Sequence, residues 1–583
     1  MLRLLSFSVL LLAASCGFAQ SQLSSPVIDG HFSEWDARAV THRDPAGDSG
    51  ASGLDLRTLR VDSDAEWVYI SFELAADLLL QQDNALKLLI DTDMDANSGT
   101  RWGGIGAELL WDFAKREGTV KLGTSSSTVK HQDIGYFPAP SMTSSRFELA
   151  FRRDTKVAGR ALFPTERMRL VLYAEEQGGD RLPDADGGVG VELRDSAPTR
   201  GDERTLRPKS ASAVRLLSWN VLQNGLLDPA RRPVFERMLR AIQPDVLCFQ
   251  ECFELSAQQV QGMIEATLQA PQGKAWRALK TDAGNVMVTH LDIEADWLIQ
   301  QNYRESAYLL RTPTGQPLLV INAHLRCCNA NDKRQQEADG VIAFLRDART
   351  PGGRIDVPTG TPTIMAGDFN LVGFRQQYIT LTTGDIVDNA THGPDSPPDW
   401  DGGPWTELEP LHPVTPFTYT WYDTGSNYAP GKLDYILYTA SAVTVEQQLV
   451  FNTAEMSDAE LARHGVQRGD ATSASDHLPR IADFLLKNTN GSGALPREDA
   501  PLLGAVYPQP AREALHFTLS STRPEVRLAL HDVLGRSLLR DKAATSATGG
   551  GAHVLTLPAL PAGRYLLTAS DERRISTRAV TLH

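Results

Sequence analysis

Apolar segments that end in a polar side chain recur through the middle of the chain, and this pattern limits the fold more than any other feature. In residues 363–371 (TIMAGDFNL) a mostly apolar run leads into Gly367, after which Asp368 and Asn370 flank Phe369. Alternate side chains of a strand point the same way, so Asp368 and Asn370 would share one face while Phe369 faces the core. This pair suits a metal-bound phosphate, although taken alone it fits a turn at a strand end equally well.

Apolar strands and helical segments alternate around this stretch. We expect strands at residues 214–220, 245–251, 318–324, 363–368, 432–438 and 480–485. We expect helices at residues 232–242 and 332–349; Pro233 suits the first turn of the former and Pro244 lies beyond its end. The alternation predicts a layered α/β domain, which we place at residues 213–487.

Several of these segments end in side chains that bind metals or phosphates. They are Asn220, Glu251, His324, Asp368, Asn370, Asp434, Asp476 and His477. Any one of them, such as His324, is more often a hydrogen-bonded structural residue. Ligands gather at the carboxyl ends of strands, and so many acceptors in one place would repel one another without a cation. An oxygen-rich set of this kind favours Mg²⁺ or Mn²⁺ in phosphoryl transfer.

Six short motifs in this region carry a family resemblance. In chain order they are SWN (218–220), QE (250–251), NAHL (322–325), GDFN (367–370), LDYIL (433–437) and SDHLP (475–479). Together they resemble the endonuclease/exonuclease/phosphatase superfamily, which includes deoxyribonucleases, abasic-site endonucleases, sphingomyelinases and inositol-polyphosphate phosphatases. The resemblance implies a four-layer α/β sandwich, in which two central sheets are flanked by helices.

The resemblance also implies a role for each residue. The metal ligands would be Glu251, Asn220 and Asp476, with Glu251 the main one. The contacts to the scissile phosphate would be His324, Asn370 and Arg304. Asp434 would hold the ring of His477, and either His477 or Asp368 would be the general base. The sequence does not decide between these two.

The resulting interpretation is a secreted, divalent-metal-dependent phosphodiesterase, with nucleic acid as the favoured substrate. A phospholipid headgroup or another small phosphoester is the alternative substrate, and a non-catalytic glycan- or surface-binding protein is the alternative of another class. The net charge of −15 argues against a generally basic nucleic-acid binder. We expect the long loop 384–409 to shape the pocket, and Tyr419 or Trp421 either to border the phosphate or to pack as support.

Residues 24–198 read as many short strands separated by polar turns, which predicts a β-sandwich. The motifs VIDGHFSEW (27–35), WVYI (67–70) and IDTD (90–93) resemble family-nine-like carbohydrate-binding domains. The resemblance implies a glycan partner, with Trp35, Trp102 and Trp111 as candidate contacts, although core packing suits them as well. The alternating carboxylates Asp91, Asp93 and Asp95 suit Ca²⁺ or a solvated acidic turn.

The two ends of the chain predict export. Residues 1–19 read as a signal peptide, with a lipoprotein signal at Cys16 as the rival interpretation. Residues 199–212 and 488–500 read as linkers. Residues 501–583 resemble the type IX secretion sorting domain, through a Tyr-Pro-x-Pro start at Tyr507 and a Pro-x-Gly-x-Tyr near the end. This resemblance implies the type IX machinery as a partner and a secreted or cell-surface protein of a Bacteroidetes-type bacterium.

Four cysteines remain after the signal peptide, all in the middle of the chain. They are Cys248, Cys252, Cys327 and Cys328. An oxidising destination favours disulfides, while zinc is the weaker alternative because adjacent cysteines chelate poorly. The predicted fold class is thus multidomain: a β-sandwich, a four-layer α/β sandwich and a small all-β immunoglobulin-like tail.

Overall fold

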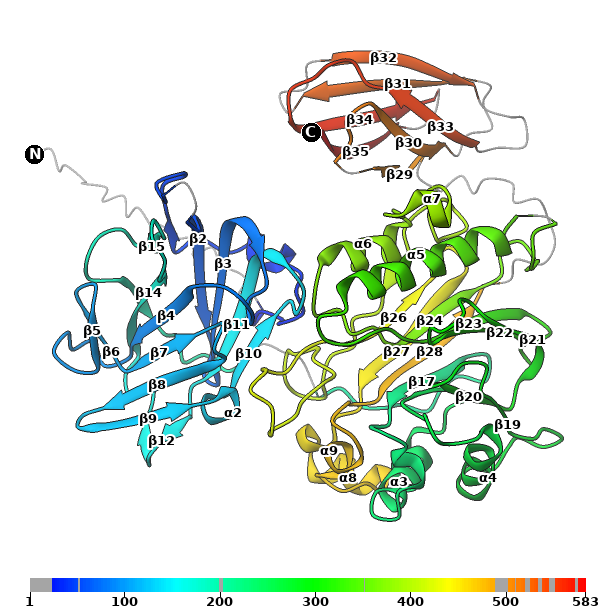
Figure 1. Cartoon of the computed structure of the whole chain (residues 1–583), viewed down its shortest axis with the longest axis horizontal. Helices are drawn as coiled ribbons and strands as arrows, with labels where there is room; N and C mark the ends of the chain where they lie inside the picture. Colours follow the sequence, from blue (N-terminus) through cyan, green and yellow to red (C-terminus); the bar gives the residue numbers. More distant parts are fainter. Residues whose placement is uncertain are drawn as a thin grey trace, which may run out of the picture.

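The computed structural model describes residues 24–50, 53–198, 203–350, 352–487, 502–508, 510–519, 525–532, 537–544, 551–571 and 575–582. The predicted signal peptide and the linker 488–500 lie outside these ranges. Three groups of sheets follow one another along the chain, coloured blue to cyan, green to yellow and orange to red in Figure 1. No helix among the described residues is long and apolar enough to cross a membrane.

Two antiparallel sheets form the N-terminal region and enclose one apolar core, as expected for a sandwich. The first sheet has the order β1 (His42–Arg43), β2 (Leu56–Ser63), β3 (Trp67–Leu78), β11 (Ser144–Arg152) and β10 (Tyr136–Ala139). The second has the order β15 (Arg181–Leu182), β14 (Arg167–Ala174), β4 (Leu86–Asp91), β7 (Leu109–Asp112), β8 (Glu117–Leu122) and β9 (Ser125–Val129), and β16 (Val189–Glu192) also pairs with β14. The short elements are α1 (Ser33–Asp36), α2 (His131–Ile134), β5 (Thr100–Trp102), β6 (Ile105–Ala107), β12 (Lys156–Val157) and β13 (Arg160–Ala161).

Two six-stranded sheets lie at the centre of the middle domain. One has the order β19 (Arg277–Leu279), β20 (Val286–Thr289), β18 (Val246–Gln250), β17 (Val214–Asn220), β28 (Arg480–Leu486) and β27 (Val443–Val450). The other has the order β21 (Asp292–Leu298), β22 (Glu305–Arg311), β23 (Pro317–His324), β24 (Thr363–Asp368), β26 (Asp434–Tyr438) and β25 (Thr406–Glu407). Their facing sides share an apolar core that includes Leu216 and Ile364.

Helices cover the outer face of each sheet. The first sheet carries α3 (Arg232–Ile242), α4 (Ala257–Thr267), α8 (Asp458–His464) and α9 (Asp470–Ala474). The second carries α5 (Asn331–Ala348) and α6 (Arg375–Thr383), with α7 (Asn389–His392) beside them. The amphipathic pattern of α3 explains its placement, because Phe235, Met238 and Ile242 all point into the core. The predicted four-layer α/β sandwich is confirmed.

The tail is an all-β unit of two sheets around its own core. One sheet contains β29 (Leu503–Tyr507), β30 (Ala514–Leu519) and β33 (Gly551–Thr556). The other contains β32 (Ser537–Ala544), β31 (Glu525–Asp532), β34 (Gly563–Ser570) and β35 (Ile575–Leu582).

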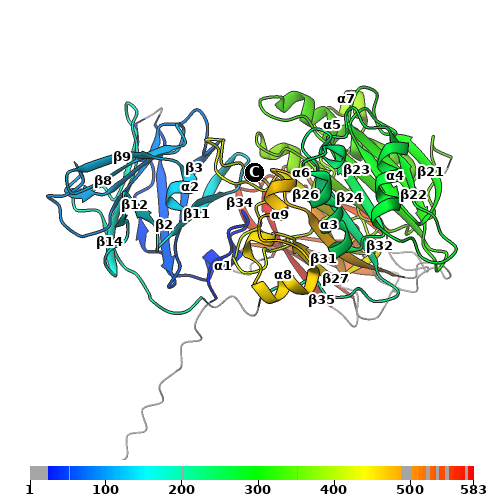
Figure 2. The ribbon, with the colours of Figure 1, turned by 90° about the horizontal axis from the view of Figure 1, so that it is seen from below.

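The sandwich and the middle domain share a contact surface (Figures 1 and 2). Ile28 pairs with Phe417 as a short parallel bridge, and the stacked rings of Phe417 and Phe137 have centroids 4.5 Å apart. The Ser141 hydroxyl donates to the Leu371 carbonyl at 2.9 Å. Backbone and apolar contacts together therefore hold the two domains in one arrangement.

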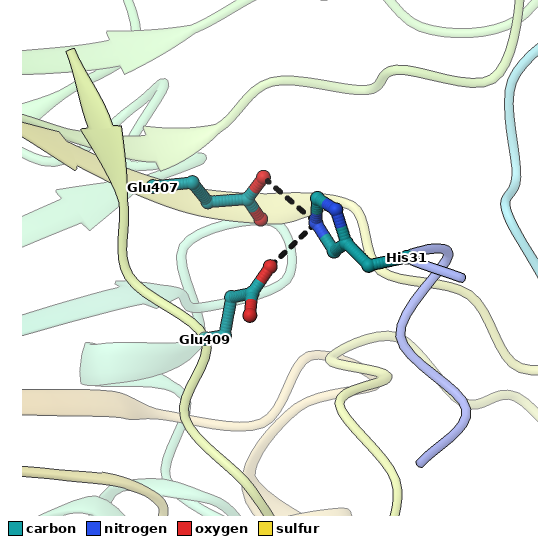
Figure 3. A group of neighbouring side chains, drawn as sticks. All are labelled: His31, Glu407 and Glu409. Carbon is teal, nitrogen blue, oxygen red and sulfur yellow. Dashed lines mark ion pairs between the residues drawn. The ribbon is translucent and has the colours of Figure 1, made fainter. Parts of the chain in front are cut away.

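An ionic cluster lies at this contact surface (Figure 3). The Nε2 atom of His31 lies 2.5 Å from a Glu409 oxygen and 3.8 Å from a Glu407 oxygen. Lys432 pairs with Glu407 at 2.9 Å and donates to the Asp29 carbonyl at 2.9 Å. Hydrogen bonds to Glu407 and Glu409 raise the pKa of His31 to about 10. Burial alone would raise the pKa of Glu407, but Lys432 and His31 together lower it to about 2.

We expect His31→Gln to lower the thermal midpoint in a pH-dependent way. Because the pKa of His31 rises from 6.5 to about 10 on folding, its stabilisation is complete below pH 6.5 and is lost as the pH rises through 10. Thermal melts of wild type and variant between pH 6 and pH 10.5 should therefore converge at the alkaline end. A gap that stays constant across this range would contradict the charged contact.

Candidate active site

Strand register brings three predicted site residues together in the second central sheet. The parallel pairing of β23 and β24 sets His324 opposite Asp368, where both strands end. The antiparallel strand β26 begins at Asp434, which is also paired with Asp368. Two acidic groups and one imidazole therefore lie at neighbouring strand ends because of the backbone register.

The first central sheet adds two more residues at the same edge. Parallel pairing of β17 and β18 sets Asn220 opposite Gln250, and Glu251 follows directly. The amide nitrogen of Asn220 donates to Glu251 at 3.1 Å and to Asp368 at 3.0 Å. Glu251 has a φ of 60°, a left-handed conformation that costs energy in a residue with a side chain. The Asn220 side chain thus links the carboxylates of the two sheets.

His477 lies between two carboxylates. Its Nδ1 atom is 2.8 Å from Asp434, and its Nε2 atom is 3.8 Å from Asp368. Burial lowers the pKa of His477, but the two carboxylates outweigh burial and raise it to about 10. The ring is therefore fixed in orientation by Asp434 and favoured in its charged form.

The pKa values of Asp368 and His324 both shift in the direction that favours the neutral form of the side chain. Burial raises the pKa of Asp368 to about 7; His477 opposes this shift, and Asp434 and Glu251 add to it. Burial, with the positive charge of Arg304, holds the pKa of His324 well below its usual range. The Nε2 atom of His324 lies 3.5 Å from Asp368, and its buried Nδ1 atom has no hydrogen-bond partner among the described residues.

One cavity of about 570 Å³ opens onto these groups. It is lined by Glu251, Arg304, His324, Asp368, Asn370, Asp476 and His477, among others. Arg304 donates to the His324 carbonyl at 3.2 Å, and Asn370 donates to the Leu325 carbonyl at 3.1 Å. Asp476 accepts from the Trp421 indole at 3.0 Å. The nine residues predicted for the catalytic site are thus brought together, seven as lining and Asn220 and Asp434 as their immediate support.

Two groups of ligand atoms at this site lie close enough to hold a cation. One atom each from Glu251, His324 and Asp368 lie within 4.8 Å of one another, as do atoms from Asp368, Asp434 and His477. The donors are mostly carboxylate oxygens, a set that suits Mg²⁺ or Mn²⁺. The residues present therefore fit a hard divalent metal.

The carboxylates Asp91, Asp93 and Asp95 of the sandwich all have partners within the sandwich itself. Asp91 pairs with Arg169 at 2.8 Å, while Asp93 and Asp95 each accept a backbone amide two residues further on. A calcium site at these three residues stays a prediction. Among the tryptophans named for glycan binding, Trp35 and Trp111 are fully buried. Trp102 stacks on Tyr173, with ring centroids 4.2 Å apart.

Two expectations about the middle domain are wrong. The loop 384–409 forms α7 and β25 and is not among the residues that line the catalytic cavity. The cysteines form no disulfide among the described residues: Cys248 and Cys252 belong to the cores on opposite sides of one sheet, and Cys327 and Cys328 are exposed neighbours. Of the two aromatic candidates, Trp421 lines the cavity, whereas Tyr419 packs at the contact with the sandwich.

Sequence reasoning missed the residues that form the outer part of the cavity. Phe253 and Tyr428 line it, as do Leu79, Gln81 and Gln82 from the sandwich. Phe253 could have been suspected, because it follows Glu251 by two residues. The sandwich residues carry no local signal, since none of them belongs to a motif.

A known family covers the middle of the chain. Residues 217–477 match the family model described as "Endonuclease/Exonuclease/phosphatase family". This match covers the region in which the six motifs resemble the same family, so it supports that resemblance for the middle of the chain. The carbohydrate-binding and sorting-domain resemblances stay predictions.

The chain is also similar to solved structures. One is an endonuclease/exonuclease/phosphatase from Beutenbergia cavernae, with 15% identity and a TM-score of 0.30 over 64% of this chain and 100% of that one. An AP endonuclease from Leishmania major has 14% identity and a TM-score of 0.28 over 49% and 93%. A beta toxin variant from Staphylococcus aureus with bound magnesium ions has 16% identity and a TM-score of 0.28 over 46% and 99%. These values are too low to transfer properties. No match was found among the curated proteins.

Proposed function

We propose that the chain is a divalent-metal-dependent hydrolase of phosphodiester bonds and that its substrate is nucleic acid. One observation carries this proposal. Carboxylates, amides and imidazoles from the ends of both central sheets converge on a single cavity. A phosphodiester is an anion, so its hydrolysis needs charge neutralisation, an oriented water and an assisted leaving group, and this set of side chains supplies all three.

The metal would be held mainly by Glu251, with Asn220 and Asp476 as the neighbouring oxygen donors. Two observations support a site that binds a cation and a phosphate. Asp368 and Asp434 are buried carboxylates close to His477, and the buried Nδ1 atom of His324 has no hydrogen-bond partner among the described residues. When bound, Mg²⁺ or Mn²⁺ would act as a Lewis acid on a phosphate oxygen. Arg304 and Asn370, which line the same cavity, would orient the phosphate.

We assign the proton-transfer roles from the pKa shifts. Asp368, with a pKa raised to about 7, suits a general base near neutral pH. His477, with a pKa raised to about 10, suits a cation that stabilises the phosphate or donates a proton to the leaving oxygen. Asp434 keeps the Nε2 atom of His477 directed at the site, because it occupies the Nδ1 atom.

Export completes the proposal. The signal peptide predicted at 1–19 and the predicted sorting domain at 501–583 support a secreted or cell-surface enzyme whose tail is removed on export. Mass spectrometry of the exported protein would identify both ends, and an intact C-terminus outside the cell would contradict removal.

Metal removal tests the proposal directly. We expect the full chain to hydrolyse plasmid DNA, RNA or a chromogenic diester with Mg²⁺ or Mn²⁺, and to lose this activity in EDTA because the clustered carboxylates are then left without their cation. Sphingomyelin belongs in the same panel, since a phospholipid headgroup is the alternative substrate. Hydrolysis that persists in EDTA would contradict the metal, and no hydrolysis of any diester would favour a non-catalytic binding protein.

A further inference from the structure

The catalytic cavity has walls from two domains. The middle domain supplies most of the lining, and the loop after β3 of the sandwich supplies Leu79, Gln81 and Gln82. The segment 421–431 of the middle domain contributes Trp421 and Tyr428 to the same cavity. A substrate in this cavity would therefore contact the sandwich as well as the catalytic residues.

Exposed aromatic side chains are rare in this protein and gather at this cavity. Among the described residues the exposed Phe, Tyr and Trp side chains are Phe253, Phe374 and Tyr428. Phe253 and Tyr428 each have a relative exposure of 39%, and both line the cavity. Exposing a large ring to water is unfavourable, so two such rings in one cavity indicate a ligand with a flat apolar face.

Tyr428 is held in place by the sandwich. The guanidinium of Arg116 lies 4.3 Å from the centre of its ring, and Arg116 in turn donates to the Gln81 carbonyl at 2.6 Å. The side chain of Gln81 accepts from the backbone of Ala429 at 2.9 Å. These contacts fix the ring before any ligand binds, which lowers the entropy cost of binding.

Phe253 stands beside the groups assigned to the phosphate. The Arg304 guanidinium lies 5.6 Å from the centre of its ring, and the His324 ring lies 6.2 Å away. A flat group stacked on Phe253 would therefore be a direct neighbour of a phosphate held by Arg304 and His324.

We propose that Phe253 and Tyr428 form a stacking subsite for unpaired nucleobases next to the scissile phosphate. Resting on the proposed phosphodiesterase function, this subsite names single-stranded nucleic acid as the substrate class. Bases in a duplex have both faces covered by their neighbours, so only an unpaired or splayed base can stack here. Stacking also supplies affinity that a chain with a net charge of −15 gains poorly from general attraction to phosphates.

A binding experiment tests the subsite without turnover. The probe is a pentanucleotide with 2-aminopurine at its centre, whose fluorescence falls when the base stacks, titrated with the full chain in EDTA. We expect quenching with wild type and about 5- to 100-fold weaker binding for Phe253→Leu and for Tyr428→Leu. Phe374→Leu, which removes an exposed ring outside the cavity, is the matched control and should bind as wild type does. The same strand annealed to its complement in a longer duplex should bind at least about tenfold more weakly than the single strand.

Three results would overturn the subsite. They are binding without quenching, equal losses in all three variants, and a duplex that binds as tightly as the single strand. Binding to sphingomyelin–phosphatidylcholine vesicles without any quenching by the pentanucleotide would likewise overturn it and assign the rings to a lipid surface. Failure of the proposed function is distinguishable, because it appears as absent hydrolysis with Mg²⁺ whatever the binding in EDTA.

Discussion

Glu251→Ala is expected to reduce kcat/KM for phosphodiester hydrolysis by about two to four orders of magnitude. Glu251 follows β18 and faces Asp368 and His324 within one group of close ligand atoms. Its two oxygens accept hydrogen bonds from Asn220 and from the backbone of Gln223. Removing this carboxylate takes away the main oxygen donor for the cation, and steady-state assays at saturating Mg²⁺ would measure the loss.

The same substitution should not lower the thermal midpoint measured in EDTA. Glu251 contributes to the raised pKa of Asp368, which means that the two carboxylates repel each other when no metal is bound. Alanine removes this repulsion and leaves the left-handed backbone unchanged. Glu254→Ala, an exposed carboxylate three residues away, is the matched control and should keep full activity. Equal losses in both variants, or a Glu251→Ala protein that melts much earlier, would contradict a role in metal binding.

Much of the middle domain could be predicted because its sequence signals are local. Strands at 214–220 and 363–368 and the helix at 232–242 have the predicted bounds. Each is a continuous apolar or amphipathic run with clear limits, such as Gly367 before the end of one strand and Pro233 in the first turn of the helix. The start of a strand is harder to place where the sequence changes gradually from polar to apolar. The strand predicted at 432–438 begins at Asp434 in the structure, two residues later than predicted.

The composition of the site was predictable, but its geometry was not. Polar residues at strand ends and the order of six motifs identified the residues, and parallel pairing explained why they would meet. The contact of Asp434 with His477, by contrast, spans 43 residues and came from the family resemblance alone. Sequence reasoning also did not reveal that Asn220 would bridge two carboxylates, since this depends on how the two sheets pack.

The sandwich side of the cavity was beyond sequence reasoning. Gln81 and Ala429 are 348 positions apart and carry no shared pattern, yet their hydrogen bond fixes the segment that bears Tyr428. The prediction for the loop 384–409 failed for the opposite reason: its length suggested that it shapes the pocket, but part of it folds as α7 and β25 and none of it lines the cavity. Disulfides were expected because the sequence predicts export, whereas Cys248 is buried in the core between the two sheets.

His477→Ala is expected to lower kcat by about two to four orders of magnitude and, unlike Glu251→Ala, to lower stability as well. The imidazolium lies between Asp434 at 2.8 Å and Asp368 at 3.8 Å, and both carboxylates are almost fully buried. Removing one member of a buried ion pair typically costs about 3–5 kcal/mol, because the remaining charge has no partner. Single-turnover rates with Mg²⁺ and thermal melts in EDTA would measure the two effects.

The variant Asp434→Asn tests whether Asp434 acts on His477 through its negative charge or only through its shape. The amide keeps the shape of the side chain but no longer favours the charged ring, so the variant should bind substrate normally and turn it over slowly. We therefore expect a lower kcat with a similar KM, whereas His392→Ala, a histidine outside the cavity, should change neither. A wild-type kcat in Asp434→Asn would contradict this role. It would mean that catalysis does not depend on the negative charge of Asp434 beside the His477 ring.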